Sequence, residues 1–135
     1  MHKYSRSLIA GAALTAFAGI IYAQSSGLTR TVVTRADVSV PNREAVVARV
    51  EIAPGGFAGW HTHPGDEISY VAEGEVVLLM AGQAPRKVIA GEGFVVPAGT
   101  VHNAKNEGVA ATKLVGVYVV EKDKSLASPA AEPGK

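Results

Sequence analysis

Residues 55–74 read GGFAGWHTHPGDEISYVAEG, and this stretch carries most of the information about the fold and chemistry of the chain. His61 and His63 lie two positions apart, so in an extended strand both side chains leave the same face. Neutral imidazoles placed in this way can bind one cation together. Glu67 follows a segment predicted to be a turn, residues 64–66, and can fold back as a hard oxygen ligand. The stretch therefore predicts one part of a metal site.

A second stretch, residues 91–106, reads GEGFVVPAGTVHNAKN and supplies His102 after the turn-forming residues 97–99. Three imidazoles and one carboxylate suit Zn, Mn, Fe, Ni or Cu and leave positions open for water or substrate. Taken alone, each of these residues also has an interpretation that involves no metal. A His-x-His pair is more often two unrelated histidines, Glu67 beside an aspartate would normally be solvated, and His102 by itself indicates nothing.

Both stretches together resemble the two motifs of the cupin superfamily, in the right order and with a compact connection between them. Every fixed position of the two motifs is met: Gly55, His61, His63, Glu67 and Gly74 in the first, and Gly91, Pro97, Gly99, His102 and Asn106 in the second. The resemblance covers residues 45–120, and the chain is similar to the small single-domain (type 2) cupins.

The resemblance implies an all-β chain folded as a double-stranded β-helix, or jelly-roll barrel. It also implies that His61, His63, Glu67 and His102 bind one divalent metal ion. Glycines and Pro97 would then shape tight turns, and Asn106 would be a structural hydrogen-bonding residue rather than a ligand. Cupins often pair as dimers, so a homodimer is one expectation for this chain.

The pattern of the remaining sequence also favours strands. In residues 45–53, the side chains of Val46, Ala48, Val50 and Ile52 share one face, and Pro54-Gly55-Gly56 is expected to end the strand. Similar short segments bounded by Gly, Pro or charged residues lie at 31–34, 68–72, 76–80, 87–90, 94–96 and 114–120. No helical period of useful length follows residue 24. We expect an N-terminal strand and lead-in over 24–44, the barrel over 45–120 and a flexible tail over 121–135.

The first 23 residues have the layout of a signal peptide: a short basic start, an apolar stretch from Leu8 to Tyr22, and small Ala23 before the expected cleavage point. The alternative is an uncleaved membrane anchor, for which the apolar stretch is short. Cleavage implies an exported protein, periplasmic or secreted, with no stable membrane association. The chain contains no cysteine, which excludes disulfides, thiolate metal sites and a lipidated N-terminal cysteine.

A net charge of +1, with Lys and Arg scattered along the chain, argues against binding to nucleic acid or to acidic membranes. The 135 residues suit one domain, and 15 glycines and 7 prolines imply many turns. The resemblance to cupins implies instead that the partner is a small-molecule ligand or substrate.

Strand alternation places Ser69 and Val71 with Glu67, and Gly59 with His61, so the inner wall beside the metal is predicted to be small and apolar. Arg49 and Glu51 are candidates to enter this pocket, although a solvated strand face is favoured for both. Tyr118 and Tyr70 are candidate proton donors, with packing as the alternative. Trp60, next to His61, is expected to point away from the metal, and no catalytic residue is assigned.

Three functions remain open. An apolar cavity around an open metal position favours a quercetinase-like dioxygenase, because this chemistry needs the fewest additional acid–base groups. A non-catalytic module that binds metal or a small molecule is the second hypothesis, and metal-dependent isomerisation or lyase chemistry is the third.

Overall fold

The computed structural model describes residues 25–134, and every element in this range is a strand. Among these residues no helix is long and apolar enough to cross a membrane. The strands are β1 (Ser26–Asp37), β2 (Arg43–Phe57), β3 (His61–Thr62), β4 (Gly65–Glu73), β5 (Glu75–Met80), β6 (Arg86–Ile89), β7 (Gly93–Val96), β8 (His102–Lys105), β9 (Thr112–Glu121) and β10 (Ser128–Pro129).

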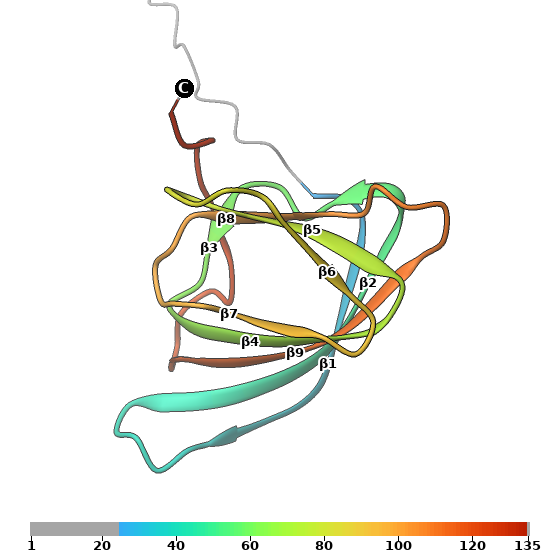
Figure 1. Cartoon of the computed structure of the whole chain (residues 1–135). Helices are drawn as coiled ribbons and strands as arrows, with labels where there is room; N and C mark the ends of the chain where they lie inside the picture. The colour runs from blue at the N-terminus through green and yellow to red at the C-terminus, as the bar shows by residue number, and fades with distance from the viewer. Residues whose placement is uncertain (1–24, 135) are drawn as a thin grey trace, which may run out of the picture.

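The strands form two antiparallel layers that face each other around a nearly closed barrel (Figure 1). One layer has the order β1-β2-β9-β4-β7, and the other has the order β10-β3-β8-β5-β6. Strand β2 belongs to both layers, because it pairs with β9 along most of its length and with β8 at its end. The predicted all-β jelly-roll barrel is confirmed.

The alternating pattern of β2 explains why the layers pack face to face. Val46, Ala48 and Ile52 are buried between the layers, whereas Arg49 and Glu51 face solvent, as the sequence predicts. Equivalent alternation in β4, β5, β7 and β9 supplies the other half of the core. Each fully buried Val, Leu or Ile contributes about 1.5–3 kcal/mol, so this apolar interior is the main stabilising term.

The prediction that Pro54-Gly55-Gly56 ends this strand is wrong. β2 continues to Phe57, and the three residues bend it from one layer into the other. Ile52 still pairs with Thr112 of β9, whereas Phe57 pairs with Lys105 of β8. Gly55 has a φ of 75°, a left-handed conformation that side chains disfavour, so a glycine is needed at the bend.

The turn predicted over residues 64–66 is confined to a bend at Pro64, between β3 and β4, since Gly65 already opens β4 and pairs with Val120 of β9. A Cβ atom at Gly65 would lie 1.9 Å from the carbonyl oxygen of Val119, so no other residue fits without moving the backbone. Asp66 accepts a hydrogen bond at 2.9 Å from the backbone N–H of Ala98, which ties β4 to the turn before β8.

The first and last strands of the described chain, β1 and β10, both pair with strands of the barrel. β1 pairs with β2 over almost its whole length, so the N-terminal strand is an integral part of the first layer. The segment expected to be a flexible tail carries β10, which pairs with β3, and the N–H of Ala130 donates to the carbonyl of Trp60 at 2.9 Å. The predicted signal peptide, residues 1–23, lies outside the described residues.

Candidate metal centre

The structure brings the four predicted side chains together. His61 and His102 stand at the first positions of β3 and β8, where the two residues pair across the strands. His63 follows β3 directly, and Glu67 points inward from β4. All four side chains are buried, and one ligand atom from each lies within 4.8 Å of the others. This group can hold one metal ion.

Each imidazole is held by its Nδ1 atom, which lies within hydrogen-bond distance of a backbone carbonyl oxygen. The pairs are His61 with Gly59 (2.7 Å), His63 with Leu126 (2.5 Å) and His102 with Thr100 (2.8 Å). A carbonyl can only accept, so the proton must be on Nδ1 and all three Nε2 atoms are turned toward the cluster. Such partners fix the ring orientation and the tautomer of metal-binding histidines.

The resulting contacts between the inward atoms are explained by a shared cation. His61 Nε2 lies 3.2 Å from His63 Nε2, and Glu67 Oε2 lies 3.0 Å and 3.1 Å from the Nε2 atoms of His63 and His102. With Nδ1 protonated, neutral rings present only lone pairs here, and lone pairs facing one another repel. Ser69 Oγ donates to Glu67 Oε1 at 2.6 Å, which leaves Oε2 for the cluster. The donor set therefore fits a divalent transition metal.

The electrostatics of the cluster favour the protonation states that a metal requires. Burial, with the nearby His102, lowers the pKa of His61 to about 4, so this ring is neutral near pH 7. Burial alone would raise the pKa of Glu67. The polar contacts with His102, His63 and Ser69 outweigh burial and hold the pKa of Glu67 well below its usual range. Deprotonated ligands are the form that binds metal.

A cavity of about 20 Å³, here called the inner cavity, lies beside the cluster. Most of its wall is apolar, as predicted, but it also contains Arg30 and Tyr118. The guanidinium carbon of Arg30 lies 5.5 Å from the centre of the Tyr118 ring, within the range of a cation–π contact. Burial, with the charge of Glu67, raises the pKa of Tyr118 to about 12, so its phenol remains protonated.

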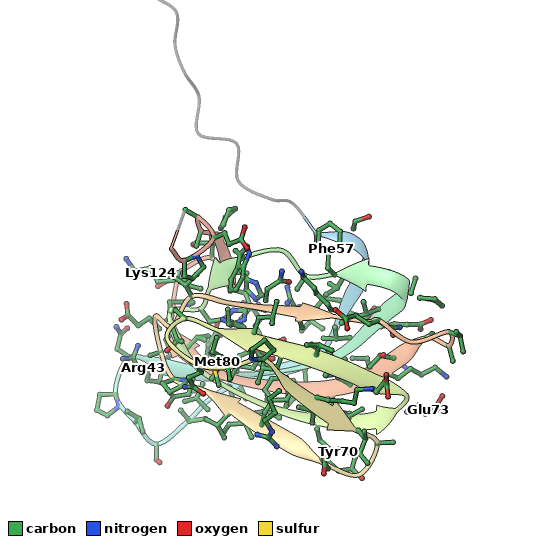
Figure 2. All side chains as sticks on the ribbon, turned by 45° about the horizontal axis from the view of Figure 1, so that its top comes forward. Arg43, Phe57, Tyr70, Glu73, Met80 and Lys124 are labelled. Carbon is green, nitrogen blue, oxygen red and sulfur yellow. The ribbon has the colours of Figure 1, made fainter. Side chains whose placement is uncertain are left out.

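The other candidate residues lie elsewhere. Arg49 and Glu51 are exposed, which confirms the solvated alternative. Tyr70 is on the outer surface, away from the barrel interior (Figure 2). Trp60 does not line the inner cavity but lines a second, outer cavity together with His61.

Asn106 has the structural role expected from the motif. Its side-chain amide donates to the carbonyls of Ile52 at 2.9 Å and Ala110 at 2.8 Å, and its oxygen accepts from the N–H of Gly108 at 2.9 Å. Its backbone exchanges hydrogen bonds with residues 55–56, so Asn106 fixes the bend of β2 next to the cluster.

Arg30 is the residue that sequence reasoning missed. It lies in β1 and reaches the interior only because β1 pairs with β2, where Arg30 is opposite Val50. The alternating pattern of residues 26–37 is weak, since most of their side chains are exposed. A clearer inward alternation would have been the only local signal.

Known proteins resemble the chain in sequence and in fold. The family model described as "Cupin domain" matches residues 48–120. Nectarin-1 of Nicotiana langsdorffii x Nicotiana sanderae is 37% identical over 97 residues, which cover 65% of this chain and 42% of that protein. The chain therefore spans less than half the length of this curated relative.

Two solved structures are also similar to this chain. Oxalate oxidase in complex with the substrate analogue glycolate has a TM-score of 0.60 and 28% identity, covering 73% of this chain and 53% of that chain. A protein with a double-stranded β-helix domain from Klebsiella pneumoniae has a TM-score of 0.63 and 24% identity, covering 78% and 85%, and this likeness concerns the fold alone.

Proposed function

This chain belongs to the cupin family, and we propose that it binds one divalent transition metal ion through His61, His63, Glu67 and His102 and oxidises a small organic acid. The observation that carries the proposal is the set of three imidazoles whose Nδ1 atoms are held by carbonyls. Two of their Nε2 atoms, those of His63 and His102, lie against one oxygen of Glu67, and the third lies 3.2 Å from His63 Nε2. Metal-binding histidines are typically held in this way, with the nitrogen that does not face the ion donating to a fixed acceptor.

When bound, such a metal would supply a Lewis acid with open positions for a substrate oxygen. The protein would contribute the remaining groups. Ser69 orients the Glu67 carboxylate, and the apolar wall of the inner cavity limits the access of water. The neutral phenol of Tyr118 can donate a hydrogen bond to a ligand in this cavity.

The choice of an organic acid rests on the likeness to oxalate oxidase. The relatives reported above do not single out a quercetinase-like enzyme, so oxygen-dependent cleavage of a phenolic substrate becomes the second enzymatic candidate. Isomerase or lyase chemistry has less support, because it needs a free acid or base near the metal. Among the described residues lining the inner cavity, every carboxylate and imidazole belongs to the cluster.

That same observation favours a binding protein without turnover as the non-enzymatic alternative. We also propose that the chain is exported after cleavage behind Ala23, to the periplasm or the exterior, because residues 1–23 have the composition of a signal peptide. Sequencing the N-terminus of the mature protein would then give Gln24 as the first residue.

Elemental analysis of the mature protein, purified from the compartment where it accumulates, is the first test. We expect one transition metal ion per chain. The metal-loaded protein would then be assayed for oxygen uptake and peroxide formation with oxalate, and in parallel for oxygen uptake with a flavonol. Turnover of the flavonol alone would favour the dioxygenase, and ligand-induced melting shifts without product would favour the binding protein. A protein persistently free of metal would refute the proposal.

A further inference from the structure

The inner cavity borders a larger space that the proposed chemistry does not use. The outer cavity measures about 320 Å³ and shares four lining residues with the inner cavity: Leu28, Arg30, Ala58 and His61. Its remaining wall is formed by Trp60 and by residues at the two ends of the described chain, namely Ser25, Ala127 and Pro129. Arg30 therefore stands at the junction between the metal cluster and the outer space.

Arg30 has unused hydrogen-bonding capacity at this junction. Its Nε atom is buried and has no hydrogen-bond partner among the residues that the structure describes. A buried donor without an acceptor costs about 1–3 kcal/mol, so a site containing one is improved by a ligand that accepts. The planar guanidinium fork matches the two oxygens of a carboxylate.

The charge of the side chains that line the two cavities also favours a ligand that accepts hydrogen bonds and carries a negative charge. Among the described residues that line the two cavities, Glu67 is the one carboxylate, and Arg30 is the one side chain with a permanent positive charge. A divalent ion held by Glu67 and three neutral imidazoles would leave a charge of +1, to which Arg30 adds another positive charge. A partly buried site with this excess attracts an anion.

The size and polarity of the two cavities indicate which ligand fits them. The inner cavity has room for about one water-sized group, so only a small head fits there without movement. The outer cavity lies at the lower end of the range typical of small-molecule sites, about 300–1,000 Å³, and Leu28, Ala58, Trp60 and Pro129 supply the apolar part of its wall. A ligand that fills both spaces has a compact polar head and an apolar body.

We propose that the two cavities form one binding site for an aromatic monocarboxylate, with the carboxylate held by Arg30 beside the metal centre and the ring in the outer cavity against Trp60. This inference rests on the proposed function, since the metal centre is the other anchor of the head. It departs from a dicarboxylate such as oxalate, which has no apolar body to place against Trp60.

Calorimetric titration with three matched probes tests the assignment: benzoate, acetate as the head without the ring, and benzyl alcohol as the ring without the charge. For the metal-loaded protein we expect benzoate to bind at least ten-fold more tightly than acetate. Arg30→Gln should weaken benzoate binding at least ten-fold and leave the affinity for benzyl alcohol unchanged. The matched control is Arg49→Gln, because Arg49 is an exposed arginine of the neighbouring strand and lines neither cavity.

Equal benzoate affinities of the Arg30→Gln and Arg49→Gln proteins would overturn the role of Arg30, and equal affinities for acetate and benzoate would overturn the aromatic subsite. Should Arg30→Gln fail to fold, Trp60→Ala provides the second measurement, with weaker benzoate binding and unchanged acetate binding expected. Metal content is measured on each sample. Arg30-dependent benzoate binding by a chain that never holds metal would refute the proposed function while supporting the carboxylate subsite.

Discussion

Replacing Asn106 by alanine should be among the most destabilising single changes outside the apolar core. The side chain makes three hydrogen bonds to backbone groups, and the residue is buried, so water cannot replace these partners. At about 0.5–1.5 kcal/mol for each lost bond, we expect the free energy of unfolding to fall by about 2–4 kcal/mol. For a domain of this size that corresponds to a melting temperature lower by about 10–20 °C.

Asn103→Ala is the matched control, since Asn103 is a buried asparagine of the same strand region. Its Oδ1 atom has no hydrogen-bond partner among the described residues, and the substitution removes the same number of atoms. Urea unfolding of both metal-free variants would measure the difference. Comparable losses for Asn103→Ala and Asn106→Ala would show that packing, not the hydrogen bonds at the β2 bend, sets the cost.

Glu67→Gln should fold normally but bind metal more weakly, and unchanged metal content and activity would argue against ligation by Glu67. His102→Ala should lower the metal-to-protein ratio, measured by elemental analysis. In the metal-free protein, the pKa of His61 is lowered from 6.5 to about 4, so the unfolded chain takes up a proton at His61 at a higher pH than the folded chain does. The free energy of unfolding should therefore be highest above pH 6.5 and should fall as the pH is lowered toward about 4. Urea midpoints over this range should show the loss, and a pH slope equally steep in His61→Ala would contradict it. We also predict a homodimer formed through the outer face of β4, where Ile68 and Tyr70 are exposed. Light scattering should show that Tyr70→Lys shifts the mass to the monomer, and a monomeric unmodified protein would refute this.

The motif residues and the inward faces of the long strands could be predicted because their signals are local. His61 opens β3 and His63 follows only two positions later, and the alternation of β2 is visible in nine consecutive residues. Two complete motifs then placed His102 beside them, although it is far away in the sequence.

What could not be predicted depends on contacts between distant parts of the chain. The bend of β2 resembles a strand end, because Pro54-Gly55-Gly56 is a turn signal in isolation and only the pairing of Phe57 with β8 shows that the strand continues. Arg30 enters the site through the register of β1 against β2, and the carbonyl of Leu126 reaches His63 across 63 positions. Neither contact leaves a pattern within its own segment.

The contact between Leu126 and His63 has a consequence for the carboxyl end of the chain. An ion that immobilises the His63 ring also favours the docked position of Leu126 and the pairing of β10 with β3, because the three interactions reinforce one another. Loading with metal should therefore slow digestion by carboxypeptidase, and the rate at which the last residues are trimmed becomes a reporter of occupancy that needs no substrate.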